Sequence, residues 1–333
     1  MLKALAEKNN KNPSIVLDFK NAPFVDKLEN RLMDVLLDSE GPIRDMCHHI
    51  LKAGGKRIRP LIVLYSGMLF SELSQNLMDA AVAAELIHMA SLVHDDIVDN
   101  SLLRRNRPSV NKIWGNEYAV LCGDYLFARA FGILSEKKLM KSMGFMVEAI
   151  TNMCHGEIHQ AGDRFNSNVN IESYYIRIAK KTAIFLQSCA KSGASIGGAD
   201  DKDIEIIGEY GLNVGYAFQI IDDILDFCGE VDVMGKEKYE DLKQGNITLP
   251  VILLMNKDEY RNWLLKTINS RRFNDDDIDK ICNALKESGV LDESSEIAAS
   301  HINKAIKCLD VLPKSNYTDF LYSLADMLQS RIN

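Results

Sequence analysis

Two short acidic patterns could bind cations, because each places three aspartates within an otherwise apolar stretch. Both read Asp-Asp-x-x-Asp, and together they contain Asp95, Asp96, Asp99, Asp222, Asp223 and Asp226. On a helix the first and third aspartates share one face, and like charges ~4 Å apart repel by about 4 kcal/mol at an effective dielectric of 20. Each cluster therefore needs protons or cations. Hard oxygen ligands favour magnesium, and two facing clusters would clamp a diphosphate.

Basic and hydrogen-bonding side chains lie near both clusters in the sequence. A turn at residues 54–60 carries three cations just before a helix start, where the helix dipole adds positive charge. The candidate donors are Lys56, Arg57, Arg59, His88, Arg104, Arg105, Lys181, Thr182, Gln219 and Lys236. Cations that face metal-loaded carboxylates would form a site for two anionic substrates, one bound through metal and one held by lysine and arginine.

Two similar patterns are assigned no chemistry. Residues 275–279 also match the acidic pattern, but they open a helix, where acidic residues complement the helix dipole. His155 and His159 are four residues apart, yet a zinc site needs a third ligand and usually a different glutamate spacing. We interpret this second pattern as ordinary helix packing.

The elements that carry these residues are expected to be helices throughout. The chain has 333 residues, 47% of them hydrophobic, and no proline between Ser109 and Leu249. Apolar residues follow helical spacing and strand-type alternation is absent, which predicts one all-α domain over residues 1–333. The predicted helices are 25–37, 61–70, 77–100, 118–134, 139–162, 180–194, 203–227, 250–255, 275–287, 293–309 and 317–332.

Charge and cysteine usage narrow the class of protein further. The net charge of −8 argues against a nucleic-acid-binding surface. The seven cysteines are scattered and form no C-x-x-C pair, which indicates a reduced, cytoplasmic protein without a zinc site. The first ten residues lack the apolar segment of a signal peptide. Apolar stretches such as residues 61–70 are too short to span a bilayer.

Taken together, the motifs resemble those of the trans-isoprenyl (polyprenyl) diphosphate synthases of the long-chain type. The resemblance spans about residues 40–255. The C-terminal part, residues 256–333, shows helical spacing of apolar residues but no motif of the family. It rests on GGKRIRP at 54–60, LIHMASLVHDDIVD at 86–99, LRR at 103–105, GDYLFARAF at 123–131, KTA at 181–183, FQIIDDILD at 218–226 and DLKQGNITLP at 241–250. It implies the all-α isoprenoid (class I) synthase fold, magnesium as cofactor, and condensation of isopentenyl diphosphate with an allylic diphosphate.

The resemblance also implies roles for individual residues. Isopentenyl diphosphate would be bound by Lys56, Arg59, His88 and Arg105. The metal would be bound by Asp95, Asp99 and Asp222, with Asp96, Asp223 and Asp226 completing the catalytic acidic set. The allylic diphosphate would be held by Arg104, Lys181, Thr182, Gln219 and Lys236, and Lys181 also counts among the catalytic residues.

One departure from the family pattern follows the second acidic cluster. The family reads Gly-Lys-Pro-x-Gly-x-Asp-Leu, whereas this chain has Glu237 in place of the proline and Tyr239 in place of the second glycine. If that glycine serves a turn with positive φ, Tyr239 must adopt a strained backbone or the loop must take another path.

Two small residues predict a long product. Ala90 and Ser91 lie about one turn below Asp95, where an aromatic side chain would block a growing chain. One helical turn of ~5.4 Å is close to the length of one isoprene unit. A product beyond geranylgeranyl is therefore expected.

Several alternatives stay open at this stage. The chain could be a farnesyl or geranylgeranyl diphosphate synthase, or the catalytic subunit of a heterodimeric synthase. A helical terpene cyclase would generally carry a different second metal motif, and an accessory subunit would be expected to have lost the acidic clusters. The protein is expected to form a homodimer, with a heterodimer as the alternative, and to bind no nucleic acid. The product could associate with a membrane.

Overall fold

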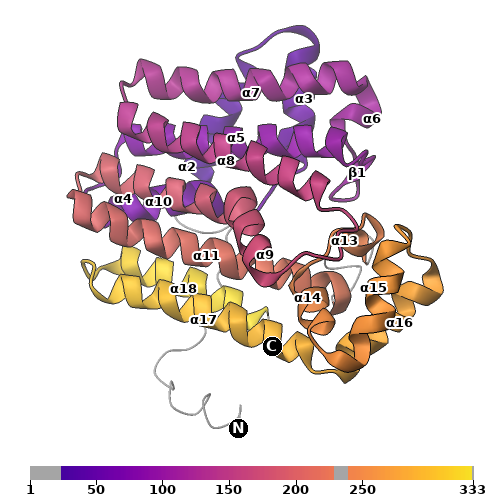
Figure 1. The fold of residues 1–333 in the computed structure, drawn as a ribbon. Coiled ribbons are helices and arrows are strands. Elements are labelled where there is room, and N and C mark those ends of the chain that lie inside the picture. Colours follow the sequence, from indigo (N-terminus) through magenta and orange to yellow (C-terminus); the bar gives the residue numbers. More distant parts are fainter. Residues whose placement is uncertain (1–23, 229–238, 332–333) are drawn as a thin grey trace.

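The computed structural model describes residues 24–228 and 239–331, and it confirms the predicted all-α fold (Figure 1). The first half contains α2 Val25–Leu37, α3 Gly41–Lys52, α4 Ile58–Met68, α5 Gln75–Val98, β1 Leu103–Arg104, β2 Arg107–Pro108, α6 Val110–Trp114, α7 Asn116–Glu136 and α8 Met140–Gly162. The second half contains α9 Ile171–Ile178, the π-helix η2 Ala179–Ala183, α10 Ile184–Gly197, α11 Asp201–Cys228, α13 Glu240–Lys243, α14 Leu249–Met255, α15 Asp258–Asn269, α16 Asp275–Glu287, α17 Val290–Asp310 and α18 Asn316–Ser330.

The predicted helices agree closely with the observed ones where the apolar spacing is regular. The bounds of α2 and α16 coincide with the prediction. The start of α16 is a helix cap, as expected, because Asn274 and Asp277 form a capping box. The basic turn differs slightly: α4 already begins at Ile58, so Pro60 occupies its third position, where a backbone N–H has no partner within the helix in any case.

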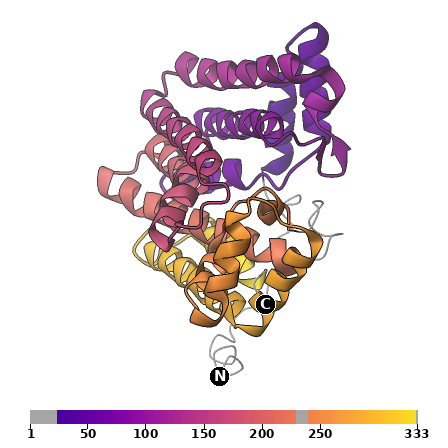
Figure 2. The same ribbon diagram turned by 45° about the vertical axis from the view of Figure 1, so that its right-hand side comes forward.

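Long helices stack side by side through most of the molecule. In Figure 1, α7, α5, α10, α11 and α17 follow one another from the top of the view to the bottom. Direct packing joins α5 to α7 and α4, and joins α10 to α4, α8 and α11. The helices α14, α15 and α16 gather beside the ends of this stack, as the rotated view in Figure 2 also shows.

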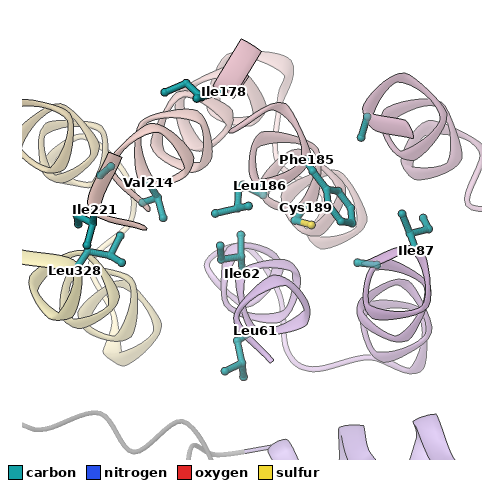
Figure 3. Close-up of a cluster of buried hydrophobic side chains, with 14 of the residues drawn as sticks. Leu61, Ile62, Ile87, Ile178, Phe185, Leu186, Cys189, Val214, Ile221 and Leu328 are labelled. Atoms are coloured by element: carbon teal, nitrogen blue, oxygen red, sulfur yellow. The ribbon is translucent and has the colours of Figure 1, made fainter. Parts of the chain in front are cut away.

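One part of the hydrophobic core, which extends over most of the helices, lies between α4, α5, α10 and α11 (Figure 3). Ile62 of α4 and Leu186 of α10 point toward each other, and both are at most 2% exposed. Phe185 of α10 points toward Ile87 of α5, and Val214 of α11 lies on the opposite side of Leu186. Burying such side chains stabilises the fold by about 1.5–3 kcal/mol each. This packing fixes α5 and α11, the two helices that carry the acidic clusters.

Among the described residues, α5 is the one helix long and apolar enough to cross a membrane. This differs from the expectation that the apolar stretches of the sequence are too short to span a bilayer. The most apolar window of α5 is 78% buried within the protein. It also carries Asp79 and Glu85 among its buried residues. These features are typical of a core helix.

Candidate active site

The two acidic clusters lie near the C-terminal ends of α5 and α11. In Figure 1 these ends adjoin the β1–β2 hairpin and α13, on the same side of the helical stack. Two adjacent residues of η2 link the clusters. The charges of Glu157 and Asp95 raise the pKa of Lys181 against the effect of burial, and Thr182 donates to Gln219, which donates to Asp223. The structure therefore brings together residues that are more than 120 positions apart in the sequence.

The three aspartates of the first cluster have different surroundings. Asp95 is half-buried, and burial followed by repulsion from Glu157 raises its pKa to about 6. Asp96 is 3% exposed and is bound by Arg104, whose Nη2 lies 2.7 Å from its Oδ1. Asp99 accepts a hydrogen bond of 3.1 Å from Arg164 Nη2. The cluster thus has one aspartate facing the site and two held by arginines.

The second cluster shows the same division of roles. Asp222 is exposed at the surface of α11. Asp223 is buried, and it accepts hydrogen bonds from Tyr174 Oη at 2.7 Å and Gln219 Nε2 at 2.9 Å. Burial, reinforced by the Asp241 charge, raises the pKa of Asp223 to about 7. The middle aspartate of each cluster is therefore bound internally by a neighbouring element.

Asp226 is tied to the segment that follows the cluster. The backbone N–H of Glu240 donates to Asp226 Oδ1 at 3.2 Å, and that of Tyr239 donates to its carbonyl at 3.3 Å. Tyr239 has φ 63° and ψ 28°, so of the two outcomes expected at this position, a strained backbone or another loop path, the structure shows the left-handed backbone. Its ring packs near Phe227 with centroids 6.3 Å apart. Lys236 and Glu237 lie outside the described residues.

A π-helix presents Lys181 and Thr182 to the site. Such short π segments inside α-helices occur frequently at functional sites. Lys181 Nζ lies 2.8 Å from Glu157 Oε1 and 3.3 Å from Gln160 Oε1, while Thr182 Oγ1 donates to Gln219 Oε1 at 2.8 Å. Gly156 permits this approach, because a Cβ there would lie 2.9 Å from the Lys181 backbone nitrogen.

The basic turn between α3 and α4 gathers most of the remaining predicted donors. Arg59 Nη1 lies 3.0 Å from His88 Nε2 on α5, and its guanidinium lies 5.4 Å from the Phe185 ring centroid. Burial and the neighbouring arginines hold the pKa of His88 well below 6.5, so His88 is neutral and accepts from Arg59. Lys56 is exposed, and burial of part of its stem lowers its pKa while the Asp222 charge opposes that shift.

A tight hairpin sends two consecutive arginines in different directions. Strands β1 and β2 pair antiparallel and are joined by Arg105 and Asn106, both with positive φ, as in a type I′ turn. Arg104 on β1 reaches Asp96, whereas Arg105 donates to the carbonyl of Gly54 in the basic turn. The hairpin therefore places Arg104 at the first acidic cluster and Arg105 at the basic turn.

Sequence reasoning missed several residues of this site. Glu157, Gln160, Arg164 and Tyr174 all bond to predicted site residues. Glu157 lies within the His155–His159 segment that was interpreted as helix packing. Glu157 could have been noticed because it lies between two histidines on a helix with few other charges. Nothing in that spacing, however, indicates that Lys181 from another helix is its partner.

Whether the site can hold a divalent cation is judged from the chemistry of its aspartate side chains. Within the described residues, no three acidic, histidine or cysteine side chains converge closely enough to hold an ion as they stand. The donors nevertheless have the right chemistry, because Asp95 and Asp99 offer hard carboxylate oxygens one turn apart. Burial and the Glu157 charge raise the pKa of Asp95, so further positive charge would stabilise its carboxylate. A cation at this place would supply it.

The two residues expected to control product length lie on α5 below Asp95. Ala90 is fully buried, and Ser91 is half-buried with its hydroxyl donating to the His88 carbonyl at 2.9 Å. Their influence on product length stays a prediction.

An all-α bundle with two aspartate clusters and a separate basic turn defines a class I isoprenoid synthase fold. The family model described as polyprenyl synthetase matches residues 40–285. The chain therefore belongs to the polyprenyl synthetase family, whose members are prenyltransferases.

Individual relatives match over nearly the whole chain. Heptaprenyl diphosphate synthase component 2 of Bacillus subtilis (strain 168) is 34% identical over 307 residues, covering 92% of this chain and 88% of that protein. The crystal structure of heptaprenyl diphosphate synthase from Staphylococcus aureus has a TM-score of 0.88 at 33% identity, covering 95% of this chain and 99% of that one. A polyprenyl synthase from Caulobacter crescentus CB15, complexed with calcium and isoprenyl diphosphate, has a TM-score of 0.86 at 33% identity and covers 92% and 94%.

Proposed function

We propose that this chain condenses isopentenyl diphosphate with an allylic diphosphate and releases a long-chain polyprenyl diphosphate. The observation that carries the proposal is that two consecutive arginines, Arg104 and Arg105, bind to two different charged regions. One comprises the acidic clusters with Lys181 and Arg104, and the other comprises the basic turn with Arg105. Two diphosphate substrates need such a division, because each must be held while their hydrocarbon ends meet.

The isopentenyl partner is assigned to the basic turn. Lys56, Arg59 and Arg105 supply positive charge there, and His88 orients Arg59 through the 3.0 Å hydrogen bond. Guanidinium groups suit a diphosphate because they bind two oxygens at once. The allylic partner is assigned to Arg104, Lys181, Thr182, Gln219 and Lys236.

Magnesium is the proposed cofactor, with Asp95, Asp99 and Asp222 as the residues that would hold it. When bound, it neutralises charge on the allylic diphosphate and so favours departure of that group. The relative from Caulobacter crescentus was crystallised with calcium and isoprenyl diphosphate, which supports a divalent cation in this family's sites.

The chain's own residues would carry the remaining parts of the reaction. Lys181 and Arg104 stabilise the negative charge on the departing diphosphate as the allylic carbon–oxygen bond breaks. The double bond of isopentenyl diphosphate then forms the new carbon–carbon bond, and a proton leaves to the released diphosphate. Apolar walls around the hydrocarbon must exclude water from the cation.

Substitution kinetics test this assignment. Lys56→Ala and Arg105→Ala are expected to raise the KM for isopentenyl diphosphate more than that for the allylic substrate, and Arg104→Ala and Lys181→Ala should do the reverse. Equal effects of all four substitutions on both substrates would contradict the assignment.

We further propose that the protein works in the cytoplasm as a homodimer, with a heterodimer as the alternative. Exposed apolar side chains on α7 and α8 support an interface there, among them Leu121 at 60% and Ile158 at 69% exposure. The relative named component 2 supports the heterodimer alternative. Light scattering on the wild type and on Leu121→Glu tests the interface: a wild-type dimer that becomes a monomer on substitution is expected, and a monomeric wild type would require a separate partner.

A further inference from the structure

The three cations of the basic turn are not equivalent, because Arg57 points into the protein. Its side chain is 5% exposed, whereas Lys56 beside it is exposed. Arg57 Nε donates to Glu29 Oε1 at 2.6 Å, Nη2 donates to Glu29 Oε2 at 3.2 Å, and Nη1 donates to Glu85 Oε1 at 2.6 Å. All three guanidinium nitrogens are thus engaged by carboxylates from α2 and α5. Arg57 has little capacity left for a substrate.

The backbone of Arg57 needs this anchorage. Its φ is 52° and its ψ is 31°, a left-handed conformation that few non-glycine residues adopt. This conformation turns the chain from Lys56 into the first turn of α4, where Arg59 lies. Conformations of this kind persist only where surrounding contacts impose them. The bonds to Glu29 and Glu85 are the contacts that do so here.

Helix α5 fixes both arginines of the turn from one face. Glu85 and His88 are three residues apart on α5 and therefore neighbour each other. Glu85 holds Arg57 and His88 holds Arg59, at 2.6 Å and 3.0 Å respectively. The same helix carries Asp95 two turns further on. The basic turn is therefore set at a defined position relative to the first acidic cluster.

Glu85 also balances the charge of the other arginines. A Cβ at Gly55 would lie 3.0 Å from Arg105 Nη1 and 3.2 Å from Arg57 Nη1, so two guanidinium groups meet over this glycine. Burial lowers the pKa of Arg59 and of Arg105, and in both cases the Glu85 charge opposes that shift. Without this carboxylate the three arginines would repel one another with no substrate present.

We infer that Glu85, acting through Arg57 and supported by Glu29, is a positioning residue for isopentenyl diphosphate. It touches no substrate, and it sets the turn in which Lys56 and Arg59 meet the diphosphate. This inference rests on the proposed function, because it takes the basic turn to be the isopentenyl site.

The experiment compares Glu85→Gln with the wild type under saturating allylic substrate. Glu85→Gln keeps the shape of the side chain but removes its charge. The expected result is a rise of about 10-fold in the KM for isopentenyl diphosphate, with the KM for the allylic substrate changed by less than about 2-fold. Arg57→Lys should share the effect, because one ammonium cannot bridge both carboxylates. Should Glu85→Gln not fold, Glu29→Gln removes the more exposed carboxylate and should raise the same KM by a smaller factor.

Asp79→Asn is the matched control. Asp79 lies on the same helix and is fully buried, and its side-chain partners among the described residues, Arg31, Lys137 and Gln75, include no residue of the basic turn. It should lower the melting temperature while leaving both KM values unchanged. A purely structural role for Glu85 would give this same pattern in Glu85→Gln and would overturn the inference.

Lys56→Ala separates this inference from the proposed function. If Lys56→Ala raises the KM for isopentenyl diphosphate and Glu85→Gln does not, the inference alone is wrong. If Lys56→Ala also leaves that KM unchanged, the assignment of the turn to isopentenyl diphosphate is wrong, and the inference is overturned together with it.

Discussion

Arg104 binds Asp96 through three short contacts: Nε lies 2.8 Å and 2.9 Å from the two carboxylate oxygens, and Nη2 lies 2.7 Å from Oδ1. The middle aspartate of the first cluster therefore acts through the hairpin, whereas Asp95 faces Lys181 and Glu157. Buried Asp223 relates in the same way to Tyr174 and Gln219. In each acidic cluster the first aspartate thus faces the site, and the middle aspartate is bound by neighbouring elements.

This relationship predicts that Asp96→Asn and Arg104→Gln are not additive. Each substitution breaks the same pair, so the double variant should lose about as much kcat/KM for the allylic substrate as the worse single variant. Asp96→Asn combined with Lys56→Ala provides the control, because Lys56 belongs to the basic turn rather than to the Asp96–Arg104 pair, and their effects should add. Additive losses for Asp96→Asn with Arg104→Gln would show that the pair does not act as a unit.

The left-handed backbone of Tyr239 predicts an unusual order of stabilities. Tyr239→Ala and Tyr239→Gly both lose the ring that packs near Phe227, but only glycine relieves the positive φ. Because a left-handed conformation costs an L-residue roughly 1 kcal/mol, the glycine variant should be more stable than the alanine variant by about that amount. Urea unfolding of the two variants measures the difference, and an alanine variant of equal or higher stability would contradict it.

Much of the fold could be predicted from the sequence because regular apolar spacing is a local property. Helix α2 buries Leu28, Leu32 and Leu36 on one face, and its bounds follow from that spacing. Helix α3 was not predicted, since it buries only Met46 and Cys47 and gives little periodic signal. Helix α15 was overlooked for a similar reason, with two buried residues, Leu264 and Ile268.

The site was predictable as a set of residue types but not as a set of pairs. The motifs identified Lys181 and Asp95, and the structure brings their charges together. The partners Glu157 and Arg164 depend on how α8 and the segment after it cross α5 and η2, which no local pattern encodes. Tyr239 is an intermediate case, because the comparison with the family's glycine left a strained backbone and another loop path open, and only the structure shows the strained backbone.

Product length is expected to respond to the residues below Asp95. Ser91→Phe is the sharper variant, because Ser91 is half-buried and can accept a larger side chain. Ala90→Phe should shorten the product too, but Ala90 is fully buried, and overpacking there would cost about 1–3 kcal/mol. Chromatography of the dephosphorylated products gives the chain length. Unchanged length in a folded Ser91→Phe variant would contradict an open path at this level.

His301 predicts a loss of stability in mild acid. It is buried between Tyr175 Oη at 3.1 Å and Asn213 Oδ1 at 2.9 Å, and burial lowers its pKa from 6.5 to about 4. His301 therefore binds a proton more tightly in the unfolded chain than in the folded protein. The stability that neutral His301 contributes is complete above pH 6.5 and is lost as the pH falls toward 4. The loss from this residue between pH 7 and pH 5 should be about 2 kcal/mol.

His301→Gln removes the titrating group and keeps a side chain able to hydrogen-bond. Thermal or urea unfolding at pH 7 and pH 5 should show a smaller fall in stability for this variant than for the wild type. Equal falls in both proteins would mean that His301 does not titrate in this range.

This chain is expected to join isopentenyl units to an allylic diphosphate. The most direct measurement incubates the purified protein with radiolabelled isopentenyl diphosphate, farnesyl diphosphate and magnesium, then sizes the dephosphorylated product. The wild type should release a labelled polyprenol longer than geranylgeraniol, and Asp95→Ala and Asp222→Ala should each lower its rate at least about 100-fold. If the protein forms no condensation product, alone or with a partner subunit, or if either folded variant keeps near-normal turnover, the account is contradicted.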